Sequence, residues 1–101
     1  MSELPKTVLS QAVPTSSTNA YTVATDTTLV ITSVLVGNTT GADIGMFLLC
    51  GAVAIFSGVA IPAHGMALLD SRIVMYEGDI INIRGAATGL TITVNGFEVP
   101  Q

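Results

Sequence analysis

The residue types that most often carry chemistry are few and scattered in this sequence. Cys50 is the only cysteine and His64 the only histidine. A catalytic thiol needs a neighbouring base or cation that favours the thiolate, whereas Cys50 lies in the apolar run at residues 46–50 with no visible link to His64. We therefore expect Cys50 to be a small buried hydrophobe. A single cysteine also excludes an internal disulfide, which is compatible with assembly in a reducing cytoplasm.

The remaining candidate residues are isolated as well. His64 lies in a loop between proline and glycine, where a lone histidine is usually solvated or hydrogen-bonded, and no cluster is spaced as the three or four ligands of a zinc site. Ser57 lacks the Gly-x-Ser-x-Gly turn that exposes a nucleophile. Glu77 and Asp79 flank Gly78 and predict a solvated hairpin tip, or else a contribution to a calcium site. The sequence thus predicts no catalytic, cofactor-binding or metal-binding residue, and no enzyme.

Composition gives the stronger indication of function. Half of the residues are hydrophobic and only 10% are charged, whereas about a quarter are charged in an average domain. Seven carboxylates outnumber Lys6, Arg72 and Arg84, giving a net charge of −4, so the basic surface that nucleic-acid binding requires is lacking. A surface so poor in charge is typical of a chain that is covered in an oligomer or a larger assembly.

Two segments bear on membrane insertion and export. Residues 44–63 are uncharged and long enough to span a bilayer, but they contain several glycines and Pro62 and have no basic flank before Arg72. We interpret them as buried strands broken by turns and expect no membrane span. Residues 1–5 lack the basic and apolar regions of a signal peptide, so none is expected.

From Tyr21 onward the pattern is that of an all-β domain. Valine, isoleucine and threonine are abundant and turn residues recur every 8–12 positions, which predicts a single antiparallel β-sandwich or jelly-roll-like domain over residues 20–101. Residues 1–19 are polar and predict an N-terminal arm, which either crosses a neighbouring subunit or is a disordered tail. Strands are expected at residues 28–36, 43–50, 53–55, 59–61, 66–69, 73–76, 81–84 and 90–94.

The last predicted strand has the clearest alternation. Thr91 and Thr93 should face outward or toward a partner, and the residues expected to face the core are Leu90, Ile92 and Val94. Beyond these the apolar positions shift to Phe97 and Val99, which predicts a β-bulge at Asn95 and Gly96. A turn or kink at residues 56–58 is expected to separate the two short strands on either side of it.

The order of these segments resembles small virion structural proteins of tailed bacteriophages, from about Tyr21 to Val99. The segments that carry the likeness are residues 21–24, 28–36, 38–41, 61–65 (Ile-Pro-Ala-His-Gly), 77–81 (Glu-Gly-Asp-Ile-Ile) and 91–98 (Thr-Ile-Thr-Val-Asn-Gly-Phe-Glu). The resemblance implies a β-sandwich with no catalytic residues, located in the virion and assembled in the host bacterial cytoplasm.

The resemblance also implies partners. These are copies of the chain, as a homotrimer, and the major capsid protein or other virion proteins. A short chain without a second domain or a receptor-binding extension favours a capsid decoration (cement) protein that binds and stabilises the head over a fibre. A tail or baseplate component is the close alternative. Two hypotheses from different classes are a small membrane-associated protein and a free-standing ligand- or carbohydrate-binding module. The mark of a carbohydrate-binding module would be exposed aromatic residues lining a groove.

Overall fold

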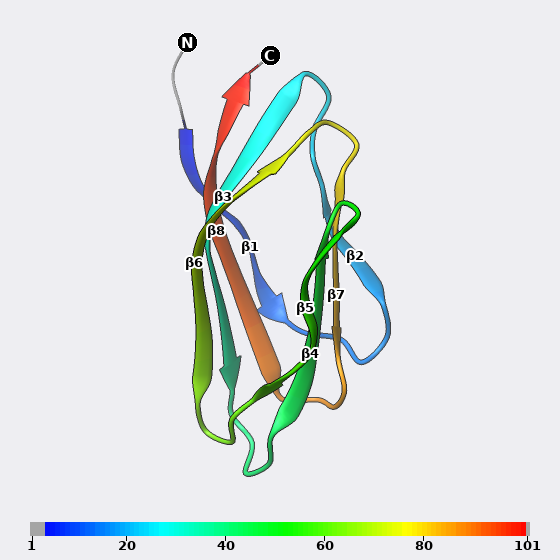
Figure 1. The fold of residues 1–101 in the computed structure, drawn as a ribbon, viewed down its shortest axis with the longest axis vertical. Coiled ribbons are helices and arrows are strands. Elements are labelled where there is room, and N and C mark those ends of the chain that lie inside the picture. The colour runs from blue at the N-terminus through cyan, green and yellow to red at the C-terminus, as the bar shows by residue number, and fades with distance from the viewer. Residues whose placement is uncertain (1–3, 101) are drawn as a thin grey trace.

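The described residues of this chain form eight β-strands in two antiparallel sheets. The structure is a computed structural model that describes residues 4–100, except for the side chains at positions 4–6 and 71. Sheet A has the order β1 (Leu4–Ala12), β8 (Leu90–Pro100), β3 (Thr27–Asn38), β6 (Met66–Met75), and sheet B the order β2 (Thr18–Thr22), β7 (Ile80–Gly85), β4 (Ile44–Cys50), β5 (Val53–Ile61). The two sheets lie face to face (Figure 1), so the predicted antiparallel β-sandwich is confirmed.

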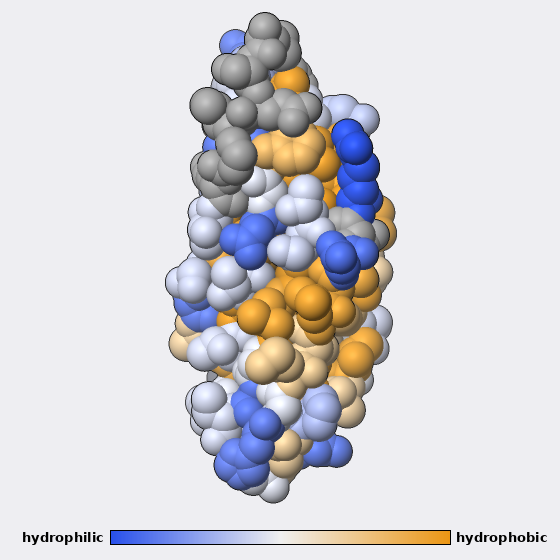
Figure 2. Space-filling view, turned by 90° about the vertical axis from the view of Figure 1, so that its left-hand side faces the viewer, coloured by the Kyte–Doolittle hydropathy of each residue, from blue (hydrophilic) through white to orange (hydrophobic). Residues whose placement is uncertain are grey.

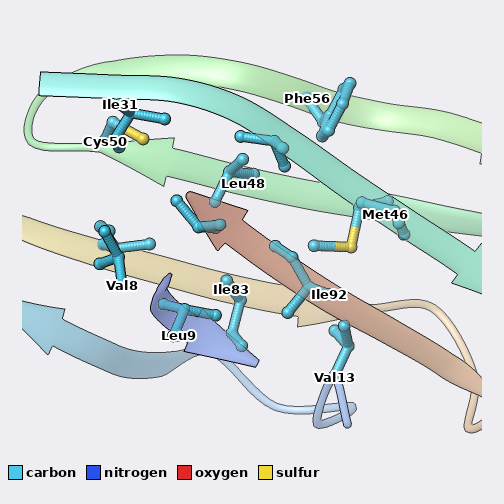
Figure 3. Packing of buried hydrophobic residues seen from close by; sticks show 14 of the residues in the cluster. Val8, Leu9, Val13, Ile31, Met46, Leu48, Cys50, Phe56, Ile83 and Ile92 are labelled. Atoms are coloured by element: carbon cyan, nitrogen blue, oxygen red, sulfur yellow. The ribbon is translucent and has the colours of Figure 1, made fainter. Parts of the chain in front are cut away.

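The core lies between the sheets and follows from the period of two along each strand. Figure 3 shows Ile31 and Ile92 of sheet A and Met46, Leu48 and Ile83 of sheet B in this shared interior. Each of these five side chains is at most 1% exposed. Complete burial of one such aliphatic side chain stabilises the fold by about 1.5–3 kcal/mol. The predicted inward positions Leu90, Ile92 and Val94 are all confirmed as buried.

Several predicted strands are present but longer than expected. The segments at 53–55 and 59–61 form one strand, β5, because the expected turn at 56–58 is a β-bulge. Met46 pairs with Val59 and Phe47 with Ser57, which leaves out Gly58 at a φ of 73°. The segments at 66–69 and 73–76 likewise join in β6, which has a register shift against β3.

The N-terminal segment differs from the predicted arm. Leu4–Ala12 pairs along β8 and Thr18–Thr22 along β7, so each is the outermost strand of its sheet. Val8, Leu9 and Val13 are buried in the core. The segment looks polar in sequence because its outward side chains are polar. These side chains bond across the sheet: Thr7 Oγ1 donates to Asn95 Oδ1 at 3.1 Å. Residues 1–3 lie outside the described residues.

The bulge predicted at Asn95 and Gly96 lies on the neighbouring strands instead. β8 keeps its alternation, while β1 shifts register between Thr7 and Leu9 and β3 between Ile31 and Ser33, both opposite this point. Gly96 continues the inward series without a side chain, because a Cβ there would overlap the carbonyl oxygen of Val30. The change of period in the sequence therefore reflects close packing of β3 on Gly96.

The uncharged segment at residues 44–63 forms β4, β5 and the turn after them. This confirms the prediction of strands broken by turns. Within residues 4–100, no helix reaches the length and hydropathy that a membrane-crossing helix needs.

Candidate interaction surface

Cys50 and His64 lie in different environments. The Cys50 side chain is 4% exposed and belongs to the core cluster, which confirms the predicted buried hydrophobe. Burial raises the pKa of its thiol to about 11, because the thiolate would lose its hydration. His64 is exposed in the turn between β5 and β6 with a φ of 52°, and its backbone N–H donates to the carbonyl oxygen of Thr40 at 2.9 Å.

The carboxylates around Gly78 hold a turn together. The turn itself is confirmed, with Gly78 at a φ of 84°. Asp79 Oδ2 accepts the backbone N–H of Tyr76 at 3.0 Å, and Glu77 Oε1 accepts that of Asp26 at 3.3 Å. Among the residues that the structure describes, no group of three or more His, Cys, Asp or Glu side chains is placed to hold a metal ion. Ser57 is exposed on β5.

The described chain has a buried polar side chain that the sequence did not single out. Asn38 is 4% exposed at the end of β3. Its Nδ2 donates to the carbonyl oxygens of Ala42 at 2.8 Å and Ile61 at 3.0 Å, and its Oδ1 accepts the N–H and hydroxyl of Thr40 at 2.9 and 2.8 Å. This amide ties the β3–β4 loop to the end of β5. The Asn-Thr-Thr-Gly turn was the only local signal for it.

The outer face of sheet A carries the most exposed of the large apolar side chains that composition predicted. Figure 2 shows hydrophobic side chains gathered near the middle of this face. On β6, Met66 is 67% exposed, Leu68 65% and Val74 43%. By register, Leu68 adjoins the half-buried Leu35 on β3. Half-exposed aliphatic side chains concentrated on one strand mark a candidate interaction surface.

A shallow depression of about 310 Å³ lies on the same face. Its lining residues are Val30, Thr32, Asp70, Arg72 and Phe97. Asp70 and Arg72 are both exposed, and within the described part of the chain neither makes an ion pair or a side-chain hydrogen bond. Two opposite charges thus stand beside an apolar surface, and neither forms an ion pair with a described side chain.

The outer face of sheet B carries more interactions between its own side chains. The guanidinium carbon of Arg84 stands 4.0 Å from the ring centroid of Phe47, a cation–π contact that covers the largest apolar group there. Ser17 donates to Asn82 and Asn82 to Asn19, each at 2.9 Å, along β2 and β7. Over β2 and β7, polar and cationic groups therefore cover this face. Apolar side chains remain exposed on β4 at Leu49 (37%) and on β5 at Val53 (60%) and Val59 (43%), but the two most exposed ones, Met66 and Leu68, lie on β6.

Comparisons with known proteins return no matching family model and no matching curated protein. The functional proposal therefore rests on the surface of the molecule.

Proposed function

We propose that this chain is a non-enzymatic structural protein that associates with copies of itself and with the surface of a larger particle through the outer face of sheet A. The observation that carries the proposal is the exposure of Met66, Leu68 and Val74 on β6. Buried apolar surface contributes about 25 cal/mol per Å², so covering these side chains favours association. With 10% charged residues, the chain has few groups to oppose it.

The most specific form of the proposal is a bacteriophage capsid decoration protein. The β-sandwich fold and the low charge are compatible with it, and the resemblance to phage virion proteins suggests the virion, the major capsid protein as partner and a trimer of this chain. A tail or baseplate component is the nearest competing hypothesis, because the same surface properties suit both.

Particle binding tests this proposal. Virions purified from lysates of the source culture should contain the protein, and immunogold electron microscopy should place it on heads. Leu68→Asp should abolish its incorporation, whereas Ser57→Asp, at an exposed polar position of β5 in sheet B, should be incorporated as wild type. Absence of the protein from purified particles, or equal incorporation of Leu68→Asp, would contradict the proposal; gold label on tails would support the tail component instead.

A second candidate is a ligand-binding module, favoured by the depression at Phe97. An aromatic ring beside Thr32, Asp70 and Arg72 can combine stacking with hydrogen bonds to a small polar ligand such as a saccharide. NMR titration of the labelled protein with a panel of oligosaccharides tests it. Saturable shifts confined to the depression would support this function, and their absence at millimolar ligand would exclude binding of those saccharides.

A further inference from the structure

The edge of sheet A at β6 is open to a further strand. β6 pairs with β3 on one side and is the last strand in the order of sheet A. The remaining outermost strands are less suited to pairing: β2 has five residues, β5 has two register shifts against β4, and β1 contains Pro5, which has no backbone N–H. Long edge strands pair readily with another chain unless they are blocked. β6 has ten residues, no proline and one register shift against β3, at residues 70–73, and is the best template of the four.

The outward side chains along this edge are arranged about a centre, with apolar residues at both ends and the charge changing sign across the middle. Residues of even number from 66 to 76 are all exposed, whereas those of odd number that are described face the core or are half-buried. In order the exposed residues are Met66, Leu68, Asp70, Arg72 and Val74 of β6 and then Tyr76, which directly follows the strand. Two apolar residues therefore stand on each side of a central pair of opposite charges.

This order is complementary to itself. We propose that the chain forms a two-fold symmetric dimer in which β6 pairs antiparallel with β6 of a second copy, with the axis at Ser71. In that register Asp70 faces Arg72 of the second copy, and the reverse, while Leu68 faces Val74 and Met66 faces Tyr76. The inference rests on the self-association proposed above and names its contact.

The charges select this register over its neighbours. A shift of two residues in one direction would put Asp70 opposite Asp70, and in the other direction Arg72 opposite Arg72. A shift of one residue would turn the apolar side chains of the second copy to the wrong face. Parallel pairing in register would oppose like charges as well, and like charges directly across a sheet are destabilising. Of these alignments, only the proposed one joins opposite charges twice.

The inner side of β6 agrees with the same alignment. Leu69 and Ile73 are partly buried and pack against the core cluster. In the proposed dimer Leu69 faces Ile73 of the second copy, so the core continues across the axis. The two sheets A become one eight-stranded antiparallel sheet. A two-fold contact of this kind gives dimers, whereas the trimer implied by the resemblance needs a different contact.

Charge reversal tests the pairing directly. In sedimentation experiments, Asp70→Arg and Arg72→Asp should each raise the dimer dissociation constant at least tenfold, because each reversal opposes like charges twice. The double variant D70R/R72D should dimerise as wild type does, and an equimolar mixture of the two single variants should form the heterodimer. Arg84→Asp makes the same charge change as Arg72→Asp but on sheet B, and it should leave the dimer intact.

Each contrary outcome overturns a particular claim. A wild-type monomer at every concentration would overturn both the self-association and the pairing. Oligomers that are indifferent to both reversals would overturn the pairing alone, and so would a double variant that stays folded by circular dichroism but fails to dimerise.

A cysteine pair provides a second measurement of the register. Leu68→Cys combined with Val74→Cys should form intermolecular disulfides on oxidation, since directly opposed residues of antiparallel strands lie within disulfide range. Leu68→Cys alone should not cross-link, because position 68 faces 74 and Cys50 is buried. Rapid cross-linking of the single variant, or none in the double variant, would contradict the proposed register.

Discussion

Replacing Asn38 by alanine should be among the most damaging substitutions outside the aliphatic core. The side chain is 4% exposed, and its amide makes four hydrogen bonds to Ala42, Ile61 and Thr40. Alanine removes the amide without offering a substitute partner, so the groups bonded to that amide must find water or remain unpaired.

The expected cost follows from which of these groups can reach water. Ala42 is exposed and the Thr40 hydroxyl can rotate, so both regain partners. The carbonyl of Ile61, a residue that is fully buried, and the partly buried N–H of Thr40 remain. An unpaired buried polar group costs about 1–3 kcal/mol, which gives a loss of about 2–6 kcal/mol for the two. That is a large share of the 5–15 kcal/mol typical of a small domain.

Urea denaturation followed by far-UV circular dichroism measures this loss. Thr39→Ala is the matched control, because its hydroxyl donates to the Gly89 carbonyl from an exposed position, and it should cost under about 1 kcal/mol. A loss below about 1 kcal/mol for Asn38→Ala would refute the reasoning, since water would then be replacing the amide.

Further substitutions test the core and its chemistry. Ile92→Asp should cost about 3–5 kcal/mol by burying a carboxylate, and Thr93→Asp, at a half-buried outward position, under about 1 kcal/mol; equal losses in urea melts would mean that both faces of β8 are covered. Gly96→Ala should cost about 1–3 kcal/mol in the same melts, because its Cβ overlaps the Val30 carbonyl. The raised pKa of Cys50, about 11 against 9.0, means that the unfolded chain loses this proton first. Stability due to the thiol is therefore full below about pH 9 and falls as pH rises toward 11, by at most about 3 kcal/mol. In melts at several pH values, the stability of Cys50→Ala should lack this fall. Identical pH profiles for Cys50→Ala and the wild type would contradict the prediction.

The strands that could be predicted from the sequence are those with one buried face. β7 and β8 alternate isoleucine and leucine with polar residues, and this pattern fixes both the strand and its inward side. β1 could not be recognised, because its outward threonine and serine side chains dominate a segment with few apolar residues. β5 and β6 each look like two short strands in sequence, since a bulge interrupts the alternation without ending the pairing.

The sequence predicted that an exposed apolar surface exists, but not where on the fold it lies. Low charge and high hydropathy indicated exposed apolar surface, but its place depends on which strands lie at the edges. That is decided by pairing between residues far apart in the sequence, such as Leu35 with Leu68. The opposite charges of Asp70 and Arg72 indicate a pairing register only once β6 is known to be an edge strand.

Sedimentation velocity of the intact protein over a wide concentration range tests self-association through β6 most directly. We predict that the wild-type protein self-associates in the micromolar range, and that Leu68→Asp, which places a charge on the exposed face of β6, sediments as a folded monomer. A wild-type protein that remains monomeric up to millimolar concentration, or a Leu68→Asp variant that associates as strongly as the wild type, would contradict this prediction.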